Sequence, residues 1–223
     1  MASRPGRHHH EPPHRRWLQR DAIVDAALVI ADREGFEAVS MRRVAAELGV
    51  GTMSLYHHVA DKDELVYEMA DAIGAEMLIP GEVPDDWREG LRQIALHTRD
   101  TFLRHSWLLE ITAERPVATP NTLRHIEQTA AAVAGLDVDE RTAMAMVMAV
   151  DDYTLGFVLR EQHVRRWERG GVFGRLQELL SAGEFPLISR WLAEGRSLEP
   201  PPARFEDGLD WLLDGMAAAL ERR

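Results

Sequence analysis

The sequence predicts an all-α protein, in which an N-terminal three-helix bundle with a helix-turn-helix precedes a larger helical domain. Two observations support this class. From residue 20 onward, apolar side chains recur every three or four residues, the spacing that gives a helix one apolar face. No segment of any length alternates between apolar and polar residues, as a half-buried strand would. Capping residues, Gly and Pro separate the periodic segments, so each helix can be bounded in turn.

The N-terminal segment, residues 1–17, is rich in Pro, His and Arg and has no apolar period. We expect it to be disordered in the free protein and to act as a basic arm whose arginines can contact phosphates. Its three consecutive histidines, residues 8–10, fit a metal tract or a tag remnant, although such short runs in a flexible tail are more often neither.

The first helix is expected to run from about Arg20 to Glu34, with Ile23, Ala27 and Ile30 facing inward. The residue before it is Gln19, which is a poor helix cap, so the start of this helix is expected to fray.

The stretch from residue 40 to residue 59 has the pattern of two short helices joined by a tight turn. Ser40 is a good N-cap, and Gly49 can adopt the left-handed conformation that ends a helix. The second helix carries Leu55 and Val59 on its inner face. The first has its apolar stripe at i, i+3, i+4 and i+7, formed by Met41, Val44, Ala45 and Leu48. This is a helix-turn-helix, a motif that places the start of its second helix in the DNA major groove.

The outward side chains of the second helix have the chemistry of a DNA-reading surface. Small hydroxyls, an aromatic ring and imidazoles can contact base edges, thymine methyl groups and phosphates. Arg42, at the start of the preceding helix, is predicted to reach a base or a phosphate. The residues of the second helix predicted to contact double-stranded operator DNA are Thr52, Met53, Ser54, Tyr56, His57 and His58.

This stretch resembles the tetracycline-repressor (TetR) family of bacterial transcription regulators, in which L-Y-x-H-[FV] recurs at the end of the recognition helix. The chain has Leu55, Tyr56, His57, His58 and Val59 in that order, and its first helix with the exit at residues 34–36 matches as well. The resemblance implies a regulator, most commonly a repressor. It also implies a phosphate contact for Lys62, for which the alternative is a solvated surface lysine.

Asp61 and Glu64 are spaced as a capping box, which predicts a fourth helix that runs to about Leu78 and stops at Pro80. Its inward row is Leu65, Met69, Ile73 and Met77. The chain is therefore expected to divide into a disordered basic arm (1–17), a helix-turn-helix DNA-binding domain (18–64) and a ligand-binding and dimerisation domain (65–223).

Every later periodic segment is also helical. Thr119 and Pro120 are expected to start one helix, and Asp137 with Glu140 forms a second capping box before a long one. The helices predicted beyond residue 85 cover about 87–105, 107–111, 120–134, 140–163, 173–181, 185–194 and a last segment from residue 205.

The long helix is apolar on every side from Ala143 to Val150, so we expect that segment to be buried all round. With the wide apolar stripe of the last helix, it offers more apolar surface than one small body can cover, which predicts a partner. In the TetR family these two helices pair with their copies, so the resemblance implies a homodimer. The predicted interface residues are Phe157, Leu209, Leu212, Met216 and Leu220.

The C-terminal region resembles the ligand domain of the same family, which implies a small-molecule effector. The matching motifs are Asp86-Trp87-Arg88, His105-Ser106-Trp107, Arg115-Pro116, Tyr153-Thr154-Leu155-Gly156 and Phe205-Glu206-Asp207-Gly208-Leu209. Where tetracycline-binding members present drug and magnesium ligands, this chain has Leu78, Ile94, Thr98 and Thr112. A largely apolar effector is therefore expected, with no metal and no cofactor.

The predicted effector-binding residues are Ile94, Thr98, Phe102, Trp107, Thr112, Met148 and Asp152. Methionines at helical spacing suit an adaptable apolar site, although they are more often ordinary core. Asp151 and Asp152 lie deep in an apolar helix and are costly unless paired. The sequence leaves open whether they cap a pocket, anchor an arginine or face a partner subunit.

Composition and charge exclude several classes of protein. The 223 residues include no cysteine, which excludes disulfides, thiolate zinc sites and cysteine nucleophiles. No apolar run approaches the ~18 residues of a membrane helix and the N-terminus is polar, so we expect a cytoplasmic protein without a membrane partner. Residues 1–62 hold nine basic and eight acidic residues, so the negative charge of the chain, −11 in total, lies in the remainder. This partition suits a DNA-binding head on an acidic body.

Two other classes of function compete with a ligand-responsive regulator. An all-α enzyme is disfavoured because the chain from residue 18 onward has no H-E-x-x-H, E-x-x-H or nucleophile motif, and because His97 and His105 lack a third ligand nearby. A DNA-binding protein without a ligand is disfavoured by the acidic body and its size.

Overall fold

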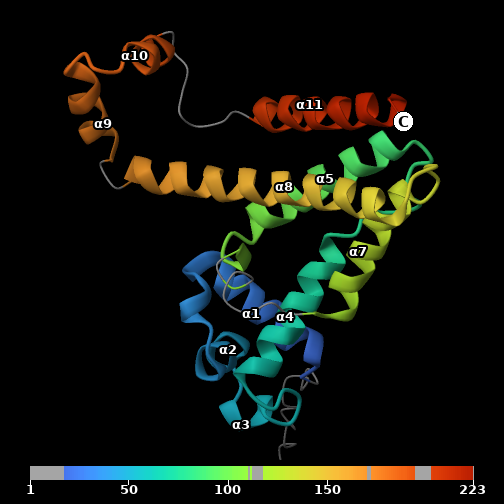
Figure 1. Ribbon diagram of the computed structural model, residues 1–223. Helices are drawn as coiled ribbons and strands as arrows, with labels where there is room; N and C mark the ends of the chain where they lie inside the picture. The colour runs from blue at the N-terminus through green and yellow to red at the C-terminus, as the bar shows by residue number, and fades with distance from the viewer. Residues whose placement is uncertain (1–17, 110, 112–117, 170–171, 194–201, 223) are drawn as a thin grey trace, which may run out of the picture.

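The computed structural model describes residues 18–109, 111, 118–169, 172–193 and 202–222, and the regular structure in these ranges is helical throughout. Figure 1 shows a small head, made by the first three helices, below a body that ends in two long helices. The all-α class is therefore confirmed. The basic arm, residues 1–17, and Thr112 lie outside the described residues.

The head consists of α1 (Arg20–Glu34), η1 (Phe36–Ala38), α2 (Met41–Leu48) and α3 (Thr52–Leu55). The Gln19 side chain makes no capping hydrogen bond, whereas the Ser40 side chain accepts one from the Arg43 amide. Gly49 ends α2 in the left-handed conformation, with φ 67° and ψ 30°. The regular part of α3 is shorter than expected, but the chain continues to turn because the Val59 amide donates to the Leu55 carbonyl over 2.9 Å.

Helix α4 (Lys62–Glu76) packs against both the head and the body, so it crosses the expected domain boundary after residue 64. The Asp61 side chain caps it as predicted, while the Glu64 carboxylate accepts from the amide of Ala60, one residue before the usual capping-box partner. At Gly74 a side chain would collide with α7 (Pro120–Val133), since a Cβ there would lie 2.9 Å from the Thr122 amide nitrogen.

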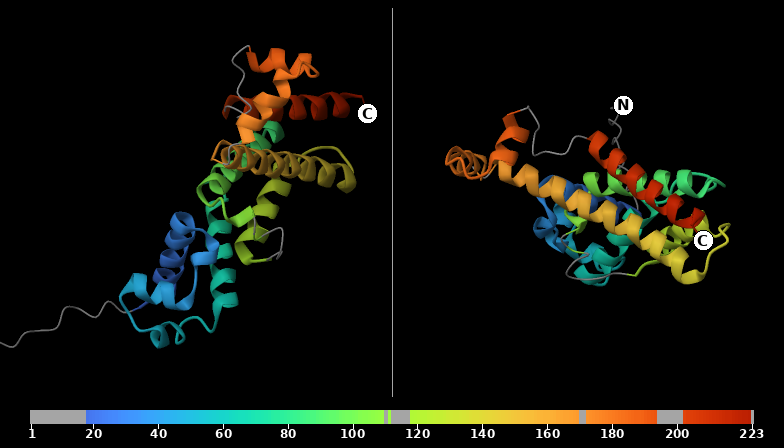
Figure 2. Two further views of the ribbon diagram at one scale, coloured as in Figure 1. Left: turned by 90° about the vertical axis from the view of Figure 1, so that its left-hand side faces the viewer. Right: turned by 45° about the horizontal axis from the view of Figure 1, so that its top comes forward.

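The body is built from α5 (Trp87–Arg104), α7, α8 (Glu140–Arg169) and α11 (Pro202–Glu221). Figure 2 shows α11 lying along α8, and α9 (Val172–Ser181) with α10 (Pro186–Ala193) projecting beyond the end of α8. The capping residue before α8 is Asp139, whose carboxylate accepts from the Thr142 amide over 2.7 Å. The predicted cap at Asp137 is wrong, and α8 extends six residues past the predicted end at His163.

The core has two parts. One joins the head to the end of α5 and to the residues after it, and it includes Phe102, Trp107 and Leu109. The other lies within the body, where α5, α7, α8 and α11 bury Phe205, Leu209 and Leu213 completely. The head and the body therefore share a core rather than meeting through α4 alone.

The expectation that residues 143–150 are buried all round is wrong for the single chain. Met144 is 59% exposed and Met148 is 47% exposed, because α5, α7 and α11 cover only one side of α8. Among the described residues, the segment Glu140–His163 is the one helix whose length and composition would suffice to cross a membrane, and 22% of its most apolar 18-residue stretch is buried. Its packing against three other helices makes it part of the fold.

Candidate DNA-binding surface and effector domain

The helix-turn-helix leaves a group of side chains accessible at the end of the head. Leu55 and Val59 are completely buried, which fixes the rotation of the recognition segment. Met53 is 72% exposed and Tyr56 is 44% exposed, and Ser54 and His57 are also exposed. Thr52 and His58 are half-buried. The six predicted residues of this segment thus lie together, with their hydroxyl, aromatic and imidazole groups at the tip of the head.

Arg20 holds the end of the recognition segment in place. Its guanidinium donates to the His58 carbonyl from Nε at 3.0 Å and from Nη2 at 2.8 Å. The same guanidinium pairs with the carboxylates of Glu64 and Glu68 on α4, the latter at 2.6 Å. Sequence reasoning missed this role, because nothing near Arg20 in the chain indicates a partner 38 residues away.

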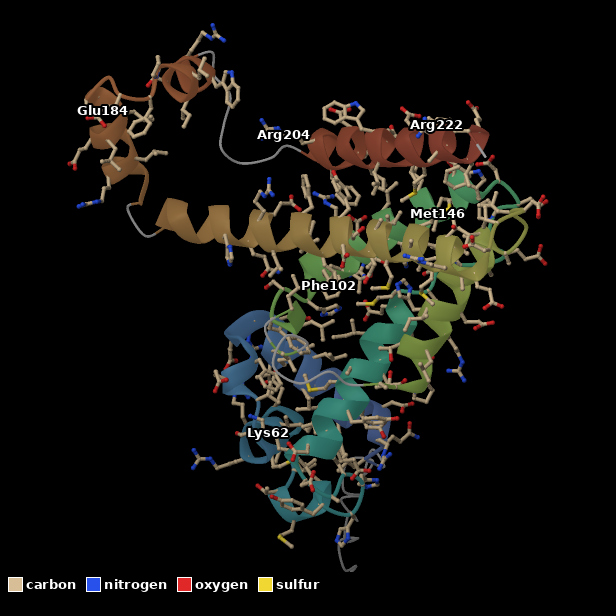
Figure 3. All side chains as sticks on the ribbon, in the orientation of Figure 1. Lys62, Phe102, Met146, Glu184, Arg204 and Arg222 are labelled. Atoms are coloured by element: carbon tan, nitrogen blue, oxygen red, sulfur yellow. The ribbon has the colours of Figure 1, made fainter. Side chains whose placement is uncertain are left out.

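The two remaining cations predicted to contact DNA are both exposed. Arg42 is exposed and forms no ion pair with any residue of the described ranges, whereas its neighbour Arg43 pairs with Glu34 at 2.8 Å and with Glu47 at 2.7 Å. The Lys62 ammonium lies 4.9 Å from the centre of the Phe36 ring, a cation–π contact that positions it without burying it. Figure 3 labels Lys62, the first residue of α4, beside the head.

The ion pairs of Arg43 connect two helices of the head. The Arg43 and Arg33 guanidiniums together lower the pKa of Glu34 to about 2. Glu34 ends α1, and Arg43 lies in the first turn of α2, so the pair links the first two helices. Because these groups are solvent-exposed, the pairs contribute little to the free energy of unfolding.

The residues predicted to bind an effector do not surround one enclosed space. Ile94, Thr98, Phe102 and Trp107 are at most 6% exposed, and Ile94 belongs to a different part of the core from Phe102 and Trp107. Met148 and Asp152 lie on the exposed side of α8. Helical spacing alone does not distinguish a pocket from a core or an interface, so the sequence predicts one site for residues that lie in different places.

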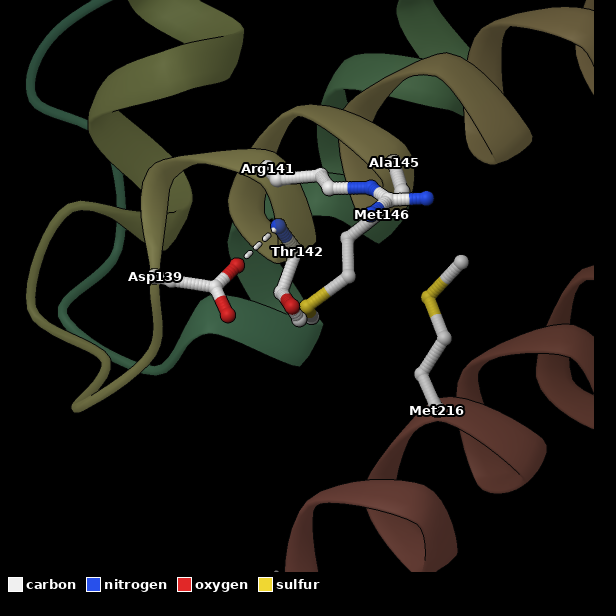
Figure 4. Close-up of a pocket in the computed structure, with 6 residues that line it drawn as sticks. All are labelled: Asp139, Arg141, Thr142, Ala145, Met146 and Met216. Atoms are coloured by element: carbon white, nitrogen blue, oxygen red, sulfur yellow. Dashed lines mark hydrogen bonds between the residues drawn. The ribbon is translucent and has the colours of Figure 1, made fainter.

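An open groove of about 470 Å³ lies where α8 begins and α11 passes it. Figure 4 shows Met146 of α8 and Met216 of α11 reaching toward each other across it, with Asp139, Arg141, Thr142 and Ala145 on its rim. None of the six predicted effector-binding residues that lie within the described ranges lines this groove.

Two polar pairs lie inside the body, and the sequence indicated neither. Arg99 of α5 donates to Glu161 of α8 at 2.8 and 3.2 Å, and both side chains are less than a tenth exposed. The Arg99 guanidinium also lies over the rings of Phe157 and Phe205. Thr98 lies 3.4 Å from Nε2 of His125 on α7, and burial lowers the pKa of that histidine.

The predicted interface residues differ in how far the single chain already covers them. Leu209 is completely buried in the body, so its side chain has no surface left for a partner. Phe157 packs against Tyr153 and Phe205, and Leu212, Met216 and Leu220 are half-buried at the edge of the same cluster. Asp151 is half-buried and Asp152 exposed, and neither forms an ion pair within the described ranges.

Known proteins match both parts of the chain. Residues 23–69 match the bacterial regulatory proteins of the tetR family, and residues 79–220 match the tetracyclin repressor-like C-terminal domain. The transcriptional repressor DrrR1 of Streptomyces coeruleorubidus is 32% identical over 92% of this chain and 80% of its own length. The class E tetracycline repressor protein of Escherichia coli is 29% identical over 92% of this chain and 94% of its own.

A solved structure shares the fold over nearly the whole chain. The Streptomyces coelicolor TetR family protein ActR, in complex with actinorhodin, superposes with a TM-score of 0.72 at 28% identity, over 92% of this chain and 97% of ActR. The helix-turn-helix surface, the two family matches and this likeness agree. The chain belongs to the TetR family of bacterial regulatory proteins and is a ligand-responsive, DNA-binding transcriptional repressor, not an enzyme.

Proposed function

We propose that the protein acts in the cytoplasm as a homodimer that binds an operator and leaves it when a small, largely apolar effector binds. The observation that carries the proposal is the group of exposed side chains of the recognition segment, which the buried Leu55 and Val59 direct outward. They are Met53, Ser54, Tyr56 and His57. A surface of hydroxyl, aromatic and imidazole groups at the start of a recognition helix has the chemistry for major-groove contacts.

Each DNA-facing residue receives a role from its chemistry. Thr52, Ser54 and Tyr56 contact base edges and thymine methyl groups, and Met53 and His57 line the groove. The phosphate contacts belong to His58, Arg42 and Lys62. Because a phosphate contact is insensitive to sequence, Lys62→Ala should weaken binding to all sequences alike and make the salt dependence shallower by about one unit.

Dimerisation is supported by apolar surface that the single chain leaves uncovered. Met144 and Met148 of α8 and Trp211 of α11 are 59%, 47% and 74% exposed. A two-fold contact through α8 and α11 would cover these side chains together with Leu212, Met216 and Leu220. It would also set two recognition segments about 34–36 Å apart, one turn of DNA.

The proposed effector class is inferred from three positions of the body that carry no metal-binding or drug-binding side chain. Leu78, Ile94 and Thr98 offer no imidazole or amide ligand at positions where tetracycline-binding members hold a metal chelate, and Ile94 is buried among apolar side chains. ActR, similar to this chain in fold, is described in complex with actinorhodin and with (S)-DNPA. An apolar molecule that enters between the body helices would need no metal.

The test begins with an operator selected from a random DNA library, so that no target gene need be known. Release of fluorescent operator is then followed by anisotropy for actinorhodin and a panel of apolar polycyclic compounds, with and without EDTA, and for tetracycline with magnesium. Release by an apolar compound that survives EDTA, with no response to tetracycline, is expected. Magnesium-dependent release by tetracycline would contradict the proposed effector class, and a panel without any release would contradict effector control.

A further inference from the structure

One polar atom inside the body has no hydrogen-bond partner. It is Nδ1 of His125, a residue of α7 that contacts Thr98 of α5 and the backbone of Met77 at the end of α4. Among the described residues it is the one buried side-chain nitrogen or oxygen that neither donates nor accepts a hydrogen bond. Buried polar groups are almost always paired, because an unpaired group has lost its water without a replacement. The unpaired nitrogen is therefore a contact point for a molecule that carries the missing group.

The other nitrogen of the ring determines where the imidazole proton lies. Nε2 of His125 is 3.4 Å from the hydroxyl oxygen of Thr98, a residue that is 3% exposed. That hydroxyl has no second hydrogen-bond partner within the described part of the chain. Its proton is bonded only if Nε2 is the acceptor, and this places the ring proton on Nδ1. The reverse arrangement would leave both the hydroxyl proton and Nδ1 without a partner, so the structure favours Nδ1 as an N–H donor.

This donor is uncharged near neutral pH. Burial lowers the pKa of His125 below its ordinary value of 6.5; the Met77 carbonyl raises that pKa and the charge of His97 lowers it further. A neutral N–H group inside the protein suits a neutral acceptor, because a carboxylate placed there would lose its hydration and gain no opposite charge. A carbonyl oxygen is the common neutral group that accepts a hydrogen bond without also donating one.

We propose that His125 selects the effector, by donating a hydrogen bond from Nδ1 to a carbonyl oxygen on an otherwise apolar molecule. Ile94 and Phe102 lie one turn before and one turn after Thr98 on α5 and both are buried, so the rest of the molecule would meet apolar side chains. The assignment rests on the proposed function and narrows its effector class to apolar molecules with a carbonyl group. Because Nδ1 is enclosed by the protein, the molecule reaches it only by displacing a neighbouring side chain.

The test measures binding without DNA, with pairs of compounds that share one ring skeleton and differ in the carbonyl group. The pairs are 9-fluorenone with fluorene, anthraquinone with anthracene and xanthone with xanthene. Tryptophan fluorescence of the full chain gives each dissociation constant. His125→Phe keeps a ring and removes the donor, whereas His125→Asn keeps an N–H group close to the position of Nδ1. His97→Phe, at the half-buried histidine next to Thr98, is the matched control.

The parent protein should bind the ketone or quinone of at least one pair about tenfold more tightly than the hydrocarbon or ether, the size of one buried hydrogen bond. This preference should vanish in His125→Phe and persist in His125→Asn and in His97→Phe. Histidine ¹H–¹⁵N correlation spectra of the free protein should show the His125 proton on Nδ1, and that resonance should shift when the carbonyl compound binds.

Three results would overturn the assignment: a proton on Nε2, equal affinities within every pair, or a preference that survives in His125→Phe. If His125→Phe does not fold by circular dichroism, the shift of the Nδ1 resonance with the carbonyl compound alone decides. The proposed function fails separately. A carbonyl compound that binds through His125 without releasing the operator would contradict effector control and leave the role of His125 intact. Release by fluorene, anthracene or xanthene as readily as by their carbonyl partners would do the reverse.

Discussion

The hydroxyl of Tyr153 occupies the space that a side chain at Gly208 would need. A Cβ on Gly208 would lie 2.3 Å from the Tyr153 hydroxyl oxygen and 3.0 Å from the ring carbon that bears it. The hydroxyl is not free to move away, since it donates to the Phe205 carbonyl over 2.8 Å. The two sequence motifs at residues 153–156 and 205–209 therefore meet in one contact between α8 and α11.

Gly208→Ala should lower the free energy of unfolding by about 1–3 kcal/mol, because α11 must move away from the Tyr153 ring. Urea unfolding at one fixed protein concentration measures the change. Gly215→Ala on the same helix is the matched control, since a Cβ there meets nothing within 4 Å, and it should be neutral or slightly stabilising. The cost should shrink in a Tyr153→Phe background. An equal cost in both backgrounds would show that the hydroxyl is not the obstacle.

Glu161→Ala should be strongly destabilising, by about 3–5 kcal/mol, because it leaves the buried Arg99 guanidinium unpaired. Asp214→Ala is the control. It breaks an ion pair between Asp214, whose side chain is 65% exposed, and Arg88, and it should lower the free energy of unfolding by at most about 1 kcal/mol in the same urea assay. The double variant Arg99→Met, Glu161→Leu removes both charges and should recover most of the stability lost in Glu161→Ala. If the single variant cost no more than the exposed control, the buried pair would have no special role.

The ionisation of Asp151 should make the free energy of unfolding depend on pH, and the direction of this dependence can be worked out. Burial, followed by the charge of Asp152, raises the pKa of Asp151 above its ordinary value of 3.8. An acid whose folded-state pKa is raised destabilises the fold once pH exceeds that pKa, and the effect vanishes below the unfolded-state pKa. Asp151→Asn should therefore stabilise the protein at pH 7 and lose this advantage as pH falls toward 4. Asp25→Asn, at an exposed site on α1, should show no such trend. A gain in stability that does not depend on pH would contradict the raised pKa of Asp151.

Met148→Glu should weaken the dimer, because a charge would be desolvated in the face proposed to pair with a second copy. Met148 tests this more cleanly than Leu212 or Met216, since those side chains also pack within their own chain. Sedimentation velocity measures the assembly state. Val29→Glu, at a residue of α1 that is 50% exposed, is the control and should leave the assembly as it is. A dimer unaffected by Met148→Glu would place the interface elsewhere.

The helices could be predicted from sequence because their signals are local. Ser40, Asp61 and Thr119 each cap the helix that they precede. The row of apolar residues on each helix determines which face packs against the core. The error at Asp137 has the same origin, since Asp139 with Thr142 offers a second cap two residues later, and the Val138 amide is already bonded to the Leu136 carbonyl.

The contacts that organise the site could not be predicted in the same way. The Asp32–His105 contact joins residues 73 positions apart, and the Arg20–His58 contact joins residues 38 apart. The local spacing of residues in the sequence indicates neither contact. The apolar row of α8 likewise has one period whether it faces a core, a pocket or a second chain, so the spacing does not distinguish these places for Met148, which is 47% exposed in the single chain.

The central claim is that the exposed row of the recognition segment reads DNA, and operator affinity of Tyr56→Ala tests it most directly. Tyr67→Ala removes another exposed tyrosine from α4 and serves as the control. Fluorescence anisotropy with the selected operator should show a loss of about ten- to a hundredfold for Tyr56→Ala, the size of one or two lost base contacts, and no change for Tyr67→Ala. Circular dichroism should be unaltered in both. Wild-type affinity in a folded Tyr56→Ala protein would contradict the account.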